Sequence, residues 1–137
     1  MSVTVDTSEV RAFAADVSGA GARAAHGGRA ALTASTAALR EDMRAAAKAG
    51  QRRSPSRIRG FPATITSTFR GLESETGPEK SGIGNLGAVL YAGGAAGGGV
   101  IEDPTQAMRR AEPAFVRALG DVAEKAALGG SGAPGAR

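Results

Sequence analysis

The stretch ATITSTFRGLESETGP, residues 63–78, decides the fold class of this chain. In its first half, threonines alternate with Ile65, Ser67 and Phe69, a β-branched pattern typical of a strand with one face in the core. An Arg-Gly pair then permits a tight turn, and residues 72–76 alternate again before a Gly-Pro pair stops the strand. The stretch predicts an antiparallel hairpin, and with predicted helices on both sides the fold class is α+β.

A long helix is predicted upstream of the hairpin. Apolar and small side chains recur close to the helical period from Val10 to Ala46. Asp6, with Glu9 three positions later, has the spacing of a capping box at its start. A short strand is expected just before it, at residues 3–5.

Glycines punctuate this helical pattern. Those at positions 19, 21, 27 and 28 each weaken a helix by up to about 1 kcal/mol relative to alanine. A kink or a break is therefore expected between residues 18 and 29, giving one interrupted helix or two. Gly50 is expected to end the helix, and residues 51–62, rich in Arg, Ser and Pro, are expected to form a solvated loop.

Downstream of the hairpin, the glycine-rich residues 82–99 allow either a short helix or a third strand. Because proline suits the first turn of a helix, Pro104 and Pro113 predict two further helices, at residues 105–111 and 113–128. Residues 1–128 are expected to form one domain, and residues 129–137 have the composition of a flexible tail.

The composition predicts a small core. Of 137 residues, 30 are Ala and 21 are Gly, and only four Phe, one Tyr and no Trp supply large rings. Since burial of apolar surface contributes roughly 25 cal/mol per Å², an isolated monomer built this way is expected to be marginally stable. A partner surface is therefore expected.

Cysteine, charge and hydropathy narrow the function classes. The chain has no Cys, which excludes disulfides, a thiolate nucleophile and cysteine metal sites. Neither a signal peptide nor an apolar run of about 20 residues is recognisable, so synthesis and assembly in the cytoplasm, without a membrane, are expected. The net charge of +4 fits contact with nucleic acid or acidic proteins, or a high-GC genome that favours Arg.

A basic ridge is the strongest charge feature. Arg40, Arg44, Lys48 and Arg52 follow one another at intervals of four along the predicted helix. Such a ridge could neutralise phosphates, or it could meet an acidic face on a neighbouring subunit. No aromatic residue alternates with it to stack bases, so subunit contact or solvation is the preferred interpretation.

Residues with catalytic or ligand-binding potential do not form a recognisable set. The one histidine, His26, lacks a Ser or Cys partner at motif spacing, and the acidic pairs at 41–42, 73/75 and 102–103 fit solvated charge better than a metal or glycosidase pair. The glycines at 93–99 lack the Lys-Ser or Lys-Thr of a phosphate loop. No catalytic residue, metal or cofactor is predicted, and an enzyme is not expected.

The order of the predicted elements carries a resemblance. Ser54-Pro55 before the hairpin, Tyr91 with Gly93-Gly94, and the segment PAFVRAL at 113–119, together with the long first helix, resemble the neck or tail-completion proteins (minor tail components) of long-tailed double-stranded-DNA phages. The likeness covers most of residues 1–128. The sequence departs from that family's pattern ahead of the hairpin and after Tyr91, where Ala92 and Gly93 replace an acidic residue and its glycine.

The resemblance implies a non-enzymatic virion protein at the head–tail junction. It implies a ring, typically of six subunits, between the capsid connector and the tail tube. Head-completion or connector proteins and tail terminator or tube proteins would be its partners, with non-specific contact with DNA in the lumen. The candidate interface residues are Arg40, Arg44, Lys48, Arg52, Tyr91, Pro113 and Phe115.

Assembly would use the small-sided helix for close approach of neighbours, the hairpin edges for strand addition, and the glycine loop and tail for ordering on docking. Two alternatives remain open. One is a small basic DNA-associated or helical secretion-linked protein that works through the ridge between Arg40 and Arg59. The other is a tail terminator, which shares the size and general architecture of neck proteins.

Overall fold

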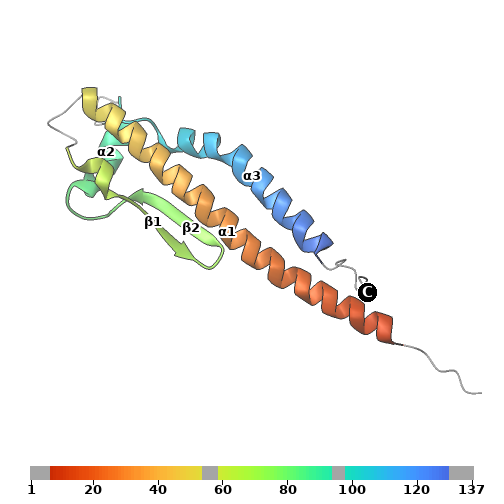
Figure 1. Cartoon of the computed structure of the whole chain (residues 1–137). Helices are drawn as coiled ribbons and strands as arrows, with labels where there is room; N and C mark the ends of the chain where they lie inside the picture. Colours follow the sequence, from red (N-terminus) through yellow and green to blue (C-terminus); the bar gives the residue numbers. More distant parts are fainter. Residues whose placement is uncertain (1–6, 54–58, 94–97, 130–137) are drawn as a thin grey trace, which may run out of the picture.

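The structure is a computed structural model that describes residues 7–53, 59–93 and 98–129. The helix α1 (Ser8–Arg53) forms a spine along which the other elements lie, as Figure 1 shows. A hairpin of β1 (Ile65–Arg70) and β2 (Glu73–Pro78) follows, then the short helix α2 (Gly87–Ala92) and the long helix α3 (Pro104–Leu128). The predicted α+β class, with a long first helix, a hairpin and a C-terminal helix, is confirmed.

The helix α1 is continuous, so the expected kink or break between residues 18 and 29 is wrong. The glycines in this region allow close packing instead. A Cβ at Gly27 would lie 2.8 Å from Cγ1 of Val122 in α3, and one at Gly28 would lie 3.8 Å from a methyl of Leu72. Tertiary contact along the helix therefore outweighs the low helix propensity of glycine.

The expected end of α1 at Gly50 is also wrong, because the helix continues to Arg53. Gly50 is buried, and a Cβ there would lie 2.8 Å from the carbonyl oxygen of Val100. The residue permits a second segment to cross the helix rather than stopping it. The expected loop at 51–62 is wrong in its first three residues, which belong to α1, and residues 54–58 of it lie outside the described residues, as does the expected strand at 3–5. Before β1, residues Phe61–Thr64 form a 3₁₀ turn.

The hairpin is confirmed, with a register two residues longer at its end than predicted. Ile65 stands opposite Pro78 and Arg70 opposite Glu73, so β2 runs through the Gly-Pro pair that was expected to stop it. Proline is tolerated because the sheet has only two strands and both are edges. Gly71 makes the turn with a φ of 60°, the left-handed region that favours glycine.

The glycine-rich region after the hairpin resolves into helix rather than a third strand among the described residues. A 3₁₀ turn at Gly82–Leu86 leads directly into α2. The two predicted C-terminal helices are a single one, α3, with Pro113 inside it. Asp103 caps its start by accepting a hydrogen bond from the Thr105 N–H at 2.9 Å.

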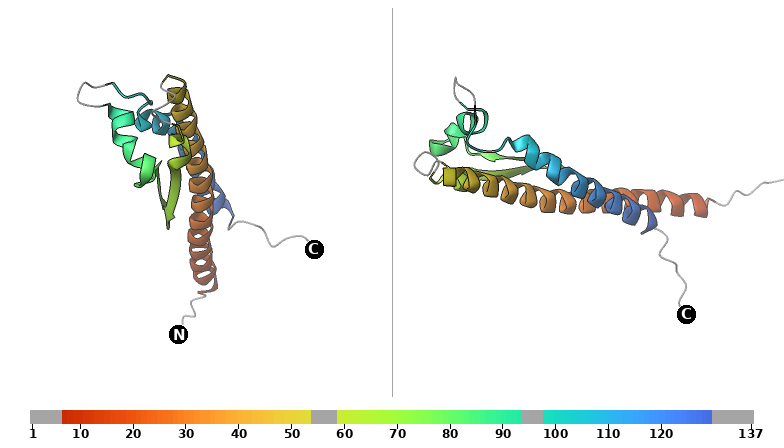
Figure 2. Two further views of the ribbon diagram at one scale, coloured as in Figure 1. Left: turned by 90° about the vertical axis from the view of Figure 1, so that its left-hand side faces the viewer. Right: turned by 90° about the horizontal axis from the view of Figure 1, so that it is seen from above.

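Contact with α1 explains why α3 passes through its proline. Ala107 is buried in the half of α3 before Pro113, and Ala126 is buried in the half after it, so both halves of the helix pack on α1. The helices run antiparallel, as Figure 2 shows, and α1 extends beyond the C-terminal end of α3. Loss of one backbone hydrogen bond at the proline is offset by this burial.

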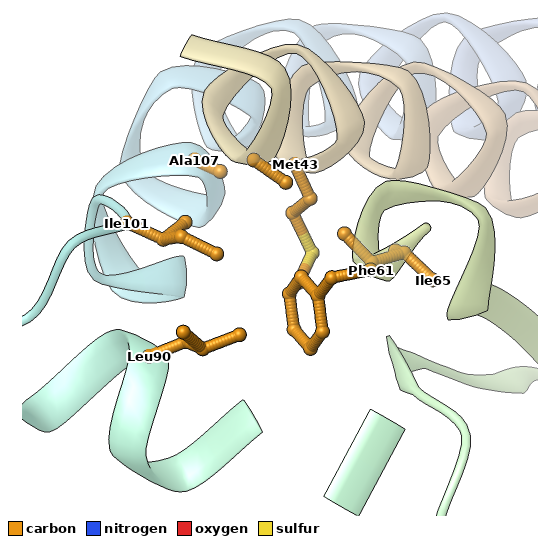
Figure 3. Close-up of a cluster of buried hydrophobic side chains, with 7 residues drawn as sticks. Met43, Phe61, Ile65, Leu90, Ile101 and Ala107 are labelled. Carbon is orange, nitrogen blue, oxygen red and sulfur yellow. The ribbon is translucent and has the colours of Figure 1, made fainter. Parts of the chain in front are cut away.

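One small core lies at the C-terminal end of α1. Figure 3 shows it where the helices meet the start of β1, and it comprises Met43, Ala47, Phe61, Ile65, Leu90, Ile101 and Ala107. Phe61 and Ile65 are its largest fully buried side chains. The predicted small core is present, and it leaves the N-terminal half of α1 with little to bury against it.

Candidate functional site

The basic ridge divides into two parts in the structure. Arg40 and Arg44, both half-buried, interact with neighbouring groups of the same chain, whereas Lys48 and Arg52 are exposed. The ion pair of Arg40 Nε with Glu41 is long, at 3.7 Å, and this buried Nε has no hydrogen-bond partner among the described residues. The ridge is therefore only partly a free cationic surface.

Arg44 joins α1 to the hairpin. Its Nε and Nη2 donate to the carbonyl oxygen of Ile65 at 3.1 and 2.9 Å, and its Nη1 donates to Glu41 at 3.1 Å. The Glu79 N–H donates to the Thr64 carbonyl at 2.9 Å, so Ile65 and Pro78 form a non-hydrogen-bonded pair of the ladder and the Ile65 carbonyl faces the outer edge of β1. The guanidinium thus satisfies a carbonyl on the open edge of the sheet.

Tyr91 lies against the core. Its ring meets Phe61 edge to face with centroids 5.9 Å apart. Burial raises the pKa of its phenol, and the hydroxyl has no hydrogen-bond partner among the described residues. The carbonyls of Leu90 and Tyr91 lie against the segment 98–101, where both Val100 and Ile101 donate to the Leu90 carbonyl. The structure thus places this interface candidate where it supports packing.

Pro113 and Phe115 lie on α3, the first exposed and the second half-buried. Phe115 lines an open groove of about 470 Å³ between α1, β2 and α3. The other apolar walls come from both helices, with Leu32 and Leu39 on α1 and Met108 on α3. We call this the α1/α3 groove.

Polar groups at the floor of the α1/α3 groove are satisfied. The hydroxyls of Thr36 and Ser74 are 2.7 Å apart and bond to each other, which leaves no demand for a polar ligand there. Arg109 and Glu112 line the groove with exposed side chains. The groove therefore suits an apolar occupant with polar or charged margins.

A second uncovered feature lies at the other end of α1. Val10, Phe13 and Val17, at intervals of three and four, share one face of the helix and have relative exposures of 66, 70 and 55 %. We call these three residues the α1 stripe. They lie on the N-terminal part of α1, which extends beyond the C-terminal end of α3. The contact between the two helices reaches as far as Arg23, which donates to the Ala126 carbonyl at 3.1 Å.

Arg110 connects the two long helices electrostatically. Its Nη2 lies 2.9 Å from Asp42 on α1 and 2.6 Å from Glu102 just before α3, and Nη1 adds a second bond to Glu102 at 2.9 Å. The bidentate arrangement raises the pKa of Arg110 and, chiefly through its hydrogen bonds, lowers the pKa of Glu102. The pKa of Asp103 is lowered as well, chiefly by the hydrogen bond from Thr105 N–H.

The acidic pairs of the sequence therefore separate into different roles. Asp42 and Glu102 hold Arg110, while Glu73 and Glu75 are exposed on β2. His26 is exposed on α1. Among residues 7–53, 59–93 and 98–129, no group of three or more His, Cys, Asp or Glu side chains could hold a metal ion.

The α1/α3 groove and the Arg110 bridge escaped sequence analysis. Both depend on residues more than 60 positions apart, such as Asp42 and Arg110, and single-sequence periodicity does not report such contacts. The α1 stripe was part of the predicted helical pattern, but its exposure was not foreseen. The signal that could have indicated this exposure is the length of α1, which is nearly twice that of α3.

Comparison with models of protein families, with curated proteins and with solved structures finds no match to this chain. In the part of the chain that the structure describes, no helix combines the length and hydrophobicity needed to cross a bilayer.

Proposed function

We propose that this protein is a structural subunit that forms a ring at the head–tail junction of a long-tailed double-stranded-DNA phage, in the neck or tail-completion position. It acts by contact between proteins rather than by catalysis. It would be made in the host cytoplasm and retained in the virion. Its neighbours would be head-completion or connector proteins on one side and tail terminator or tube proteins on the other.

The observation that carries the proposal is the distribution of apolar surface. The chain has one small core at one end of α1 and leaves the α1 stripe and the α1/α3 groove uncovered. Soluble monomers rarely expose such apolar surface without a partner. A protein of this kind gains stability by assembly, which is what a ring subunit requires.

The order of the elements supports the proposed place in the virion. A long first helix, a hairpin, a short helix that carries Tyr91 and a C-terminal helix follow one another in the order on which the resemblance to neck proteins rests. A tail terminator remains an alternative within the same virion region, because fold order alone does not separate the two roles.

The test is cryo-electron microscopy of purified phage particles that contain this protein. We expect a ring of its density between connector and tail tube, typically with six copies. Particles without such a ring at the head–tail junction, or with the protein only on packaged DNA, would refute the proposal. Density at the tube-proximal end, in contact with tail tube subunits alone, would favour the tail terminator.

A small basic DNA-associated protein is the second candidate, and one observation favours it. Lys48 and Arg52 are exposed, one turn apart, and have no ion pair among the described residues. The variant Lys48→Glu/Arg52→Glu tests it, because it reverses two charges without touching Arg44, which joins α1 to the hairpin. Loss of a salt-sensitive shift of DNA in a gel, with assembly intact, would favour the DNA-associated role.

A further inference from the structure

The α1 stripe and the α1/α3 groove cannot cover each other within one chain. Phe13 in the stripe and Ser35 in the groove lie on the same continuous helix, 22 positions apart. At a rise of 1.5 Å per residue, roughly 33 Å of helix separates them. Because α1 has no break in which to fold back, any contact between stripe and groove must join two molecules.

The stripe has the form of an insert. Its three side chains continue the helical spacing of Ala24 and Ala31, which are half-buried further along α1. On the N-terminal side of Arg23, α1 continues beyond the end of α3, and no described element packs against the stripe there. Residues 130–137 contain only Gly, Ala, Ser, Pro and Arg, and so have no large apolar side chain with which to cover it.

The groove has the form of a receptor for such an insert. Leu32, Leu39, Met108 and Phe115 give it apolar walls, and the Thr36–Ser74 hydrogen bond removes the polar demand of its floor. Amphipathic helices dock into apolar grooves through residues at positions i, i+3 and i+7. Val10, Phe13 and Val17 have this spacing.

We propose that the α1 stripe of one copy docks in the α1/α3 groove of the next copy, so that copies join head to tail. This inference rests on the proposed assembly into a ring and names the contact that would build it. Because stripe and groove are different surfaces, the contact can repeat from copy to copy as a heterologous contact, which generates closed rings or open filaments. Reciprocal pairing of two copies would give a two-fold dimer instead, and a ladder of cross-linked multimers separates the two arrangements.

Charges at the margins of the two surfaces are complementary. Glu9 and Asp16 flank the stripe, and Arg109 lines the groove; none of them has an ion pair among the described residues. Arg11 near the stripe supplies the opposite charge for Glu112 of the groove. Such pairs fix register and orientation more than affinity.

The contact is weak for a single pair of copies. Three side chains in a groove are fewer than the roughly 20–30 residues a side of a standard stable interface. Ring closure compensates, since each subunit then makes two such contacts and the last one is intramolecular. Copies are therefore expected to associate weakly in solution and firmly in the assembled ring.

Cysteine cross-linking tests the proposal, because the natural chain has no Cys. The variants are Phe13→Cys in the stripe, Met108→Cys in the groove, and the two combined. Met108 is 60 % exposed and Phe13 is 70 % exposed, so neither change disturbs the core. The full chain is oxidised at high concentration, and in particles where it is incorporated, and the products are separated by size.

We expect a ladder of multimers from the double variant, dimers only from a mixture of the two single variants, and monomers from either single variant alone. Dimers of Phe13→Cys alone would show that stripe pairs with stripe and would overturn the proposal. The control is Val89→Cys on α2, where the side chain has an exposure of 55 %. Cross-linking of the double variant no greater than that of this control would also overturn the proposal. If the double variant forms a ladder in solution but the protein is absent from particles, the contact between stripe and groove is supported and the proposed neck role is wrong.

Discussion

Gly27 of α1 lies directly beneath Val122 of α3, so close that a Cβ at position 27 would stand 2.8 Å from one methyl of Val122 and 3.1 Å from the other. The sequence suggests a weak point in a helix at this position, and the structure uses it as the point of closest approach between two helices.

Gly27→Leu is expected to lower the free energy of unfolding by about 1–3 kcal/mol, since the larger side chain forces α3 away from α1. Gly21→Leu is the matched control, because no atom lies within 4 Å of a Cβ at Gly21 and leucine has the higher helix propensity. Urea unfolding followed by circular dichroism measures both. Equal effects of the two substitutions would contradict close packing at Gly27.

Gly50→Ala is expected to destabilise the protein by about 1–3 kcal/mol, although alanine is the better helix former. The new Cβ would lie 2.8 Å from the carbonyl oxygen of Val100, a backbone atom that cannot rotate away. Gly21→Ala, in the same helix, is expected to stabilise by up to about 1 kcal/mol. A stabilising Gly50→Ala would show that the chain segment at Val100 does not cross α1 there.

Arg44→Ala is expected to cost about 1–3 kcal/mol, because it leaves the Ile65 carbonyl without its two donors. Arg44→Lys keeps the charge but cannot donate two hydrogen bonds to the carbonyl in the same geometry, so we expect an intermediate loss of stability. The exposed Lys48→Ala serves as the control, with a change within about 0.5 kcal/mol. Hydrogen exchange at β1 amides locates the effect, and unchanged protection there would refute the role given to Arg44.

Acid is expected to weaken the contacts that hold the start of α3 to the segment just before it. Arg110 holds the pKa of Glu102 below its ordinary value of 4.5, so the carboxylate contributes stability above that pH. The contribution is lost as the pH falls through the lowered pKa of the folded state, when Glu102 takes up a proton. Asp103, whose pKa is lowered from 3.8, loses its contribution in the same direction.

Glu102→Gln is expected to remove part of this pH dependence below about pH 4.5 and to lower the melting temperature slightly at neutral pH, because exposed ion pairs contribute little. Glu124→Gln on α3, which has no ion pair among the described residues, is the control. Thermal unfolding between pH 3 and 7 makes the comparison. Parallel curves for both variants and the natural chain would exclude the Arg110 bridge.

The charge reversal Lys48→Glu/Arg52→Glu is expected to leave the folded structure intact and to leave incorporation into particles unchanged. The two side chains are exposed and form no ion pair among the described residues. Particle composition after complementation with the variant gives the measurement, and Phe13→Asp is the comparison expected to reduce incorporation. Loss of incorporation by the charge reversal alone would place the exposed half of the ridge in an interface.

The hairpin and the presence of helix on both sides of it were predictable from the sequence because their signals are local. Alternation of threonine with Ile65 and Phe69 identifies a strand, Gly71 identifies its turn, and Pro104 identifies the start of α3. The scarcity of large apolar side chains likewise predicted a small core. Each of these inferences needs only neighbours along the chain.

Only the tertiary structure decided how glycine, proline and arginine are used. Gly27, Gly50 and Pro113 are helix-weakening residues in isolation, yet each lies inside a helix because packing across α1 exceeds the local cost. Arginine is usually a surface charge, yet Arg44 bonds to β1 and Arg110 bonds to α1, each to a residue more than 20 positions away in the sequence. The sequence by itself determined the hairpin and the presence of helix before and after it. The continuity of α1 and α3, the groove, the exposed stripe and the bridges depend on contacts between distant residues, whose energies no local pattern records.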